Sequence, residues 1–428
     1  MSLKFKYTSG LLGLFLFCTS LASAQTSASS YSAIGIGDFN YYGSTHNAAM
    51  GGLGVSNGNV LFFNTVNPAL VAKHNIGIFQ AGVNYENRSL SNGTLEQPVD
   101  GGGLTYLGLG LPMKPGKWSI ALGLNPVTTV NYNLSIPAEQ IGGTEFSAEN
   151  NIKGTGGMTE AYVTNAFRIK DNFYIGLKMS YLFGSIIEQN IQTIVDDNGF
   201  PVGNQTEYYD RQSFSDFSAQ LGVAYNYKLK DQLFLNFGAA YQFDADINTR
   251  RFLSVGLLDN QNSGVPIGDT LINDRQNFVS LPGRSSFGIS IEKSFNWTFG
   301  VDVHLRDMTS YRGFDGVTEN FDNAYSVIVG GEFTPDYTSS ESRLKTWIYR
   351  FGVSYDKTPY LIGSQQINDV GINFGVSVPV RQISMLNVAL KAGQRGTLDN
   401  GAIRENYFRV ALGVTINDTS WFIKRKFD

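Results

Sequence analysis

The chain has 428 residues, a formal net charge of −4 and 16% charged residues, whereas typical soluble proteins have about 25%. A single cysteine argues against a disulfide framework and a cysteine-ligated metal site, and the sequence has no basic stretch of the kind that nucleic-acid binding needs. The 48 glycines and the 13% aromatic residues favour β-structure instead.

The first 24 residues have the pattern of a secretory signal peptide. A basic start and an apolar run over residues 11–18 precede an A-x-A cleavage site at residues 22–24. The apolar run is too short to cross a bilayer as a helix. We therefore expect residues 1–24 to be removed, which leaves a mature chain without cysteine because Cys18 is the only one.

The next segment, residues 25–75, differs from the rest of the chain. It is rich in small residues, as in "AAMGGLGVSNGN", and it lacks sustained alternation of apolar and polar positions. Pro68 would interrupt any helix that passed through it. We expect this hatch segment to fold back into the lumen of a barrel, with a flexible periplasmic extension as the alternative.

From residue 76 onward, apolar and polar residues alternate in segments of about ten, separated by turn residues. In residues 347–356 one set is Trp347, Tyr349, Phe351, Val353 and Tyr355, and the other is Ile348, Arg350, Gly352, Ser354 and Asp356. Side chains alternate across a strand, so one face is apolar and the other is mostly polar or small. We expect the first face to meet lipid and the second to meet a lumen.

The repetition of this pattern predicts an all-β fold, a transmembrane antiparallel β-barrel of about 14 strands over residues 76–428. The predicted strands are 76–88, 101–112, 117–131, 157–168, 172–188, 207–228, 232–250, 283–293, 296–310, 323–334, 345–357, 367–379, 385–396 and 404–417. The short connections are expected in the periplasm, and the long ones, at 132–156, 189–206 and 251–282, as extracellular loops. A soluble β-sandwich and two tandem β-domains are the alternatives.

Several stretches, in their order along the chain, resemble the long-chain fatty-acid transporter (FadL-type) family of outer-membrane proteins. They are "NPALVA" at 67–72, "LPGRSSFGISIEKSFNWTFGVDVHLRDMTSY" at 281–311, "SVIVGGEF" at 326–333, "YRFGVSYDKTPY" at 349–360, "LNVALKAGQRGT" at 386–397 and "ENYFRVALGVTINDTSWF" at 405–422. The second departs from the family pattern, because Asp307-Met308 stands where Asp-Trp is usual. Residues 80–280 agree with the family only in pattern.

The resemblance implies a 14-stranded outer-membrane barrel with a lumenal hatch and passive uptake of hydrophobic molecules such as long-chain fatty acids. Asn67, Pro68 and Ala69 match the hatch motif, and we expect them to form a structural elbow. Ligand pockets combine apolar walls with a few polar anchors. Arg350 and Lys391, both on inward-facing positions, are therefore our candidates for holding a ligand carboxylate.

An enzyme is not expected, and neither is a cofactor or a metal. His304 shares its predicted inward face with Asp302 and Arg306, but such charged ladders are common in barrel lumens, and no G-x-S-x-G stretch accompanies the histidine. The "DDNG" at 196–199 is read as a turn with too few carboxylates for calcium. The main rival to uptake is a FadL-type barrel that binds proteins, for example as an accessory of a secretion system. A non-specific porin would leave the hatch segment without a role.

Overall fold

The computed structural model describes residues 29–40, 43–258, 267–317, 321–381 and 383–419. The predicted signal peptide, residues 1–24, lies outside the described residues. Within those ranges, no helix combines the length and the apolar character needed to cross a membrane. The helical turns are short: η1 (Ser30–Ala33), α2 (Thr45–Ala48), η2 (Pro68–Lys73), η3 (Met308–Ser310), η4 (Arg343–Thr346) and η5 (Asp399–Gly401).

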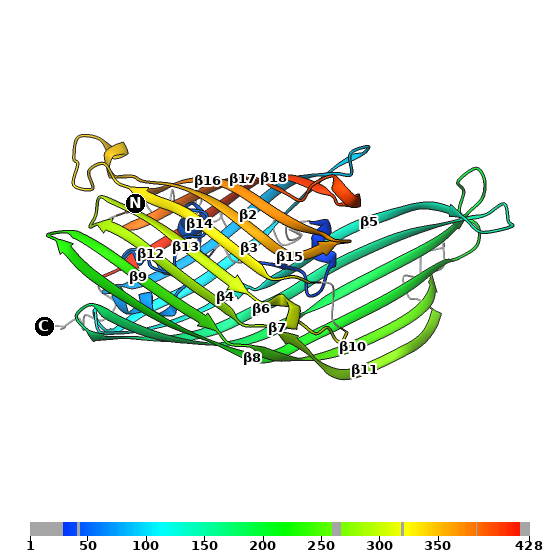
Figure 1. The fold of residues 1–428 in the computed structure, drawn as a ribbon, viewed down its shortest axis with the longest axis horizontal. Helices are drawn as coiled ribbons and strands as arrows, with labels where there is room; N and C mark the ends of the chain where they lie inside the picture. The colour runs from blue at the N-terminus through cyan, green and yellow to red at the C-terminus, as the bar shows by residue number, and fades with distance from the viewer. Residues whose placement is uncertain (1–28, 41–42, 259–266, 318–320, 382, 420–428) are drawn as a thin grey trace, which may run out of the picture.

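The rest of the described chain is mainly a closed antiparallel barrel, in which each strand pairs with the next and the last pairs with the first (Figure 1). The wall consists of β2 (Gly77–Ser91), β3 (Glu96–Lys114), β4 (Trp118–Pro126), β6 (Ser147–Lys170), β7 (Phe173–Val195), β8 (Gln205–Lys230), β9 (Leu233–Gln242), β12 (Arg284–Lys293), β13 (Trp297–Arg306), β14 (Ala324–Phe333), β15 (Ile348–Ile362), β16 (Gln365–Arg381), β17 (Ser384–Arg395) and β18 (Arg404–Asp418). The predicted 14-stranded transmembrane barrel is therefore confirmed.

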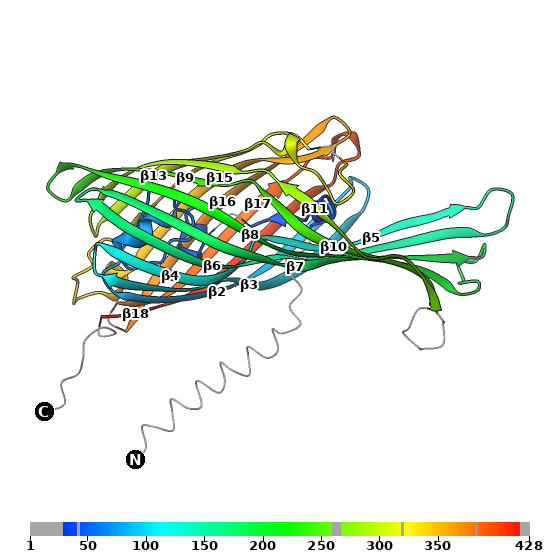
Figure 2. The same ribbon diagram turned by 90° about the horizontal axis from the view of Figure 1, so that it is seen from below.

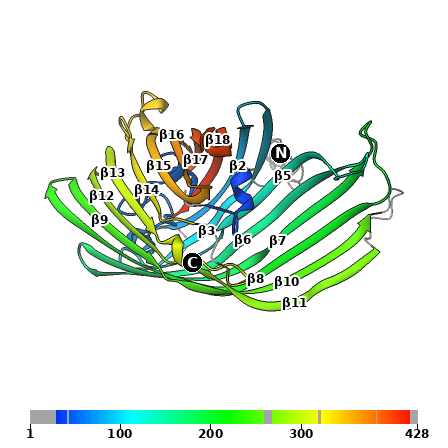
Figure 3. The ribbon, with the colours of Figure 1, turned by 45° about the vertical axis from the view of Figure 1, so that its right-hand side comes forward.

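Three further strands extend one side of this wall. β5 (Thr128–Gln140) continues β4 along β6, β10 (Ala245–Leu258) continues β9 along β8, and β11 (Ile267–Leu281) pairs with β10. Together with the ends of β6, β7 and β8 they form a six-stranded sheet that projects beyond the remaining strands (Figures 2 and 3). We call it the projecting sheet, and we assign its end of the barrel to the extracellular side, where barrels carry their long connections.

The projecting sheet corrects the prediction of three long extracellular loops. The pairing of β6 with β7 continues without a loop from Lys170↔Phe173 to Ser147↔Val195, through the segments predicted to be irregular. Among the described residues, the segments at 132–156 and 251–282 are largely strand, and that at 189–206 is strand over residues 189–195 and 205–206. Outside the membrane both faces of a sheet can carry polar residues, so the alternation that marked the other strands is lost there.

The barrel faces follow the predicted parity. Phe351 and Val353 are 45% and 49% exposed on the outer surface, whereas Arg350 and Ser354 are 3% and 0% exposed. Lipid covers an outer face of this kind in the membrane, and a charged side chain is tolerated on the lumenal face. The orientation expected for β15 is therefore confirmed.

The hatch segment lies in the lumen, as predicted, and the structure divides it into two parts. Residues 43–75, here called the plug, fill the barrel at the end where short turns connect the strands (Figure 1). In the plug, α2 packs on β16, β17 and β18, and η2 packs on β4, β6, β7 and β8. Residues 29–40, here called the strap, cross the opposite, extracellular mouth.

Glycines in the wall allow the plug backbone to approach it closely. A Cβ atom on Gly222 would lie 2.2 Å from Asn67 Oδ1, and one on Gly352 would lie 2.2 Å from the carbonyl carbon of Met50. Glycine is needed where another backbone comes this near. Plug backbone also approaches Gly176, Gly238 and Gly330, and the plug side chains of Phe63 and Ala49 approach Gly108 and Gly375. The glycine content of the chain therefore serves the fit of the plug.

The strap closes the mouth by bonding to opposite walls. The Ser29 amide donates to the Asn131 carbonyl of β5 at 3.1 Å, and the strand β1 (Asp38–Phe39) pairs with the start of β5. On the other side the Tyr31 hydroxyl donates to the Ile403 carbonyl at 2.5 Å. Apolar side chains of the strap, of the wall and of the segment after β13 form one buried cluster. The cluster includes Met158, Leu182, Phe214, Met308, Tyr311 and Tyr360.

Candidate binding cavity and lateral opening

The hydrogen-bonded wall is interrupted between β3 and β5. β3 pairs with β2 from Glu96 to Gly110, but it pairs with β4 only between residues 107 and 114. β5 pairs with β6 on one side, and on the other the described residues provide only the two-residue strand β1. The facing edges of residues 96–106 and 130–140 are therefore not joined by strand pairing.

The sequence Asn125-Pro126-Val127 marks the interruption, because β4 ends there and β5 begins one residue later. Proline has no amide hydrogen to donate to a neighbouring strand. The Val127 amide instead donates to the Met158 carbonyl at 2.8 Å, and the Val127 carbonyl accepts from the amide of Asn40 at 2.9 Å. The strap thus takes the place of a wall strand at this point.

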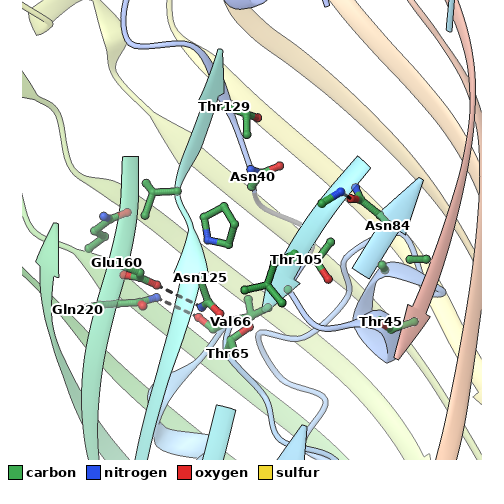
Figure 4. A pocket seen from close by; sticks show the side chains of 18 of the residues that line it. Asn40, Thr45, Thr65, Val66, Asn84, Thr105, Asn125, Thr129, Glu160 and Gln220 are labelled. Atoms are coloured by element: carbon green, nitrogen blue, oxygen red, sulfur yellow. Dashed lines mark hydrogen bonds between the residues drawn. The ribbon is translucent and has the colours of Figure 1, made fainter. Parts of the chain in front are cut away.

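A cavity of ≈ 160 Å³ lies inside the barrel against the interruption (Figure 4). Its lining comes from the plug, at Thr45, Thr65 and Val66, and from the wall on both sides of the gap. Leu104 and Thr105 line it from β3, and Asn125, Pro126 and Val127 from the end of β4. The cavity therefore lies between the plug, the strap and the lateral opening.

The wall of this cavity presents polar and apolar surface in nearly equal parts, and several of its polar side chains bind one another or the plug. Glu160 accepts from Lys178 Nζ at 2.9 Å, from Ser180 Oγ at 2.8 Å and from Asn125 Nδ2 at 3.3 Å. Gln220 donates to the carbonyl of Val66 at 2.9 Å, which ties β8 to the plug. The charge of Glu160 is thus balanced by Lys178, and the plug and wall hold the lining in place.

The motif residues Asn67, Pro68 and Ala69 form the start of η2. The Asn67 side chain accepts from the Ala69 amide at 3.0 Å and donates to the carbonyls of Val55 at 2.7 Å and Val223 at 3.1 Å. Pro68 occupies the first helical turn, where its missing amide hydrogen costs nothing. The motif connects two parts of the plug to β8. Its expected role as a movable elbow stays a prediction.

Arg350 and Lys391 do not line the cavity. Arg350 Nε bonds Glu332 Oε2 at 2.9 Å, its Nη1 donates to Ser377 Oγ, and its guanidinium lies 4.7 Å from the ring centre of Phe62 in the plug. Lys391 Nζ lies 3.9 Å from Asp369 Oδ1 and 5.3 Å from the ring centre of Tyr407. The cations that line the cavity are Lys178, Arg284 and Arg409. A ligand contact by Arg350 or Lys391 stays a prediction.

Asp302 and His304 have separate partners. The Asp302 carboxylate accepts from the amides of Gly54 at 2.7 Å and Val55 at 2.8 Å, which holds the plug to β13. His304 Nδ1 bonds Ser286 Oγ at 2.8 Å. Among the residues that the structure describes, no group of three or more metal-binding side chains comes together.

A buried ion network, missed in the sequence, holds the strap. Arg395 bonds Asp369 at 3.1 Å within the wall and Asp38 of the strap at 2.6 Å. Glu405 accepts from Ser29 Oγ at 2.9 Å and from Ser30 Oγ at 2.6 Å. Parity along the strands places these wall residues inward, but nothing in the sequence pairs them with residues 29–38.

The lateral opening and Asn125 were also missed, although the sequence carried a signal. Asn125-Pro126 lies inside the predicted strand 117–131, and proline within a central strand argues against unbroken pairing on both sides. The cavity residues Glu160, Lys178 and Gln220 have no such signal, because they resemble any other inward-facing polar residue.

A family model decides the relationship. The BamG model matches residues 7–428. The chain belongs to the BamG family. A search of curated proteins found no match to this BamG-family chain.

Solved structures share the barrel of this BamG-family chain at low sequence identity. The CymD monoaromatic hydrocarbon channel is 12% identical with a TM-score of 0.56, and the match covers 88% of this chain and 98% of CymD. The toluene transporter TbuX of Ralstonia pickettii is 14% identical with a TM-score of 0.56, over 89% and 99% of the two chains. A FadL homologue of Pseudomonas aeruginosa is 14% identical with a TM-score of 0.55, also over 89% and 99%. The likeness establishes a FadL-type outer-membrane barrel fold.

Proposed function

We propose that the protein is a non-enzymatic outer-membrane channel that takes up small hydrophobic molecules and releases them sideways into the bilayer. The observation that carries the proposal is the position of the cavity, which lies directly against the interrupted wall between β3 and β5. The hydrocarbon channels and transporters with the same fold support the choice of hydrophobic ligands.

Release to the side requires less rearrangement than release through the plug. The plug is fixed by the Asn67 and Asp302 hydrogen bonds and by its fit against wall glycines. Each buried hydrogen bond contributes about 0.5–1.5 kcal/mol, and one to a charged group about 1.5–3 kcal/mol. The facing edges of β3 and β5 have no such bonds to break. A ligand in the cavity therefore meets its lowest barrier at the lateral opening.

Loading from outside requires the strap to move, because the strap covers the extracellular mouth. Its contacts to Arg395, to Glu405 and to the Tyr360 hydroxyl are polar, and its contacts to the apolar cluster are not. An apolar ligand that enters this cluster would replace strap side chains with its own surface. We also propose that long-chain fatty acids are among the ligands. Arg350 or Lys391 would then bind the fatty-acid carboxylate.

Cross-linking the lateral opening tests this function. The predicted mature chain has no cysteine, so Leu104→Cys and Val127→Cys provide one thiol on each side of the gap. Joining them with a cleavable bismaleimide should abolish toluene uptake into proteoliposomes, and cleaving the linker should restore it. The single-cysteine variants treated in the same way are the controls. Uptake that continues through the linked protein would refute lateral release.

A protein-binding role is the second candidate, favoured by the projecting sheet. The face of this sheet that continues the lumenal side of the wall exposes apolar side chains. Ile136 is 47% exposed, Tyr208 is 44% exposed and Leu257 is 48% exposed. Such a face outside the membrane is typical of an interaction site. If it binds a partner protein, Tyr208→Ser with Leu257→Ser should release a partner that co-purifies with the wild-type barrel, while toluene uptake stays unchanged. A partner that remains bound to the double variant would contradict this candidate.

A further inference from the structure

The polarity of the cavity indicates a narrower class of ligand, an inference that rests on the proposed channel function. A hydrocarbon in this space would bury amide and hydroxyl groups without giving them a hydrogen bond, which is unfavourable. We propose that the cavity binds an uncharged amphipathic molecule, with a hydroxyl- or amide-bearing head among the polar side chains and an apolar tail at the lateral opening.

Two atoms beside the opening have hydrogen-bonding capacity to spare. Asn125 Oδ1 and Thr105 Oγ1 are buried, and neither has a hydrogen-bond partner among the described residues. They lie on β3 and at the end of β4, where the wall is interrupted, and both residues line the cavity (Figure 4). Buried polar atoms are normally paired, and exceptions need a reason. Both atoms lie just behind the cavity surface, so a rotation of each side chain would have to bring them to the ligand. A ligand hydroxyl or amide N–H would then donate to Asn125 Oδ1, and Thr105 Oγ1 can donate or accept.

The charges around the cavity favour a head without net charge. Glu160 is paired with Lys178 at 2.9 Å, and Arg409 is paired with Glu86 at 2.5 Å. A cationic head would have to compete for Glu160, and an anionic head would have to compete for Lys178 or Arg409 unless it bound Arg284, whereas a neutral head leaves both ion pairs intact. Arg284, which also lines the cavity, is the group on which an anionic head would depend.

The apolar part of the lining determines how the ligand is oriented in the cavity. Leu104, Pro126 and Val127 lie together at the interrupted wall, and Leu104 is 48% exposed on the outside of the barrel. One water needs about 10–15 Å³ of space, so ≈ 160 Å³ holds a small organic head but not a long chain as well. The tail must therefore extend through the opening toward the lipid, with the head turned toward the plug.

Binding to the full-length protein in nanodiscs tests the ligand class with three probes: hexyl β-D-glucoside, toluene and hexanoate. Calorimetry should show that the glucoside binds at least about tenfold more tightly than either of the others, as expected for a few added hydrogen bonds. Tighter binding of toluene would overturn the polar head, and tighter binding of hexanoate would overturn its neutrality in favour of Arg284.

Variants tie the result to the two unpaired atoms. Thr105→Val and Asn125→Leu should each weaken glucoside binding by about fivefold or more, and leave toluene binding unchanged or stronger. Thr105→Val preserves the side-chain shape, so it remains informative if Asn125→Leu fails to assemble. Asn151→Leu, on an exposed position of the projecting sheet, is the matched control and should have no effect. Glucoside binding that survives Thr105→Val unchanged would refute the assignment.

The cross-linked channel separates this inference from the proposed function. If linking residues 104 and 127 stops toluene uptake but the glucoside does not bind selectively, the channel stands and the ligand class is wrong. If linking changes the uptake of none of the three probes, the proposed function with its lateral release is wrong.

Discussion

Gly222→Ala should release the plug from the wall without damaging the barrel. The added Cβ would lie 2.2 Å from Asn67 Oδ1 and 2.8 Å from Pro68 Cδ, distances at which the Asn67 turn must shift. That shift would break or weaken the three hydrogen bonds of the Asn67 side chain. At about 0.5–1.5 kcal/mol each, they contribute about 1.5–4.5 kcal/mol to plug docking.

Conductance in planar bilayers measures this release, because a displaced plug leaves an open lumen. We expect frequent large openings from Gly222→Ala and a closed wild-type channel. Protease added to the purified protein should also cleave residues 43–75 of the variant faster, while the barrel keeps its heat-modifiable migration on gels.

Two further variants make the test specific. Gly142→Ala adds the same methyl group where no atom lies within 4 Å, and it should behave as wild type. Asn67→Ala removes the same hydrogen bonds from the plug side and should resemble Gly222→Ala. If Gly222→Ala conducts and resists protease like Gly142→Ala, the close fit of plug and wall does not hold the plug, and the reasoning fails.

Three other predictions address the plug, the lipid face and pH. Asp302→Asn should loosen the plug by about 1.5–3 kcal/mol, since it weakens the charge-assisted bonds to the Gly54 and Val55 amides; unaltered protease protection of the plug would contradict this. Phe351→Arg should cost about 2–4 kcal/mol and reduce the assembled barrel in outer membranes, whereas Phe351→Leu should assemble normally; equal yields would argue against a lipid-facing position. Burial lowers the pKa of His74 from 6.5 to about 4. Between these pH values, His74 is therefore protonated in the unfolded chain and neutral in the folded chain. The contribution of His74 to stability should therefore fall by up to about 3 kcal/mol as the pH drops from 6.5 to 4, measured as the urea midpoint, and His74→Gln should reduce the pH dependence by that amount.

Arg350 shows how far sequence reasoning reaches for a single residue. The alternation of β15 places it on the lumenal face, because a guanidinium is costly against lipid. The sequence does not reveal that Glu332, Ser377 and the ring of Phe62 surround it. Removing Arg350 would leave Glu332 with a buried charge and one neutral partner, Asn59, so Arg350→Ala is not a mild substitution.

The sequence by itself determined the strand number, the lipid-facing side of each strand and the existence of a lumenal segment. Those features follow from local periodicity, since adjacent side chains on a strand meet opposite surroundings, lipid and lumen. The strands of the projecting sheet were not predicted, for the same reason. Water lies on both faces of this sheet, so its strands lack the alternation of apolar and polar residues by which the other strands were predicted.

The tertiary structure alone decided which groups meet. The strap bonds to residues more than 350 positions away, as Ser29 does with Glu405, and the plug selects its contacts from strands throughout the barrel. The lateral opening arises because Pro126 divides one long strand, so that residues 96–106 of β3 have no paired neighbour on that side. Such pairings depend on barrel closure and on the register between distant strands, which no local pattern specifies.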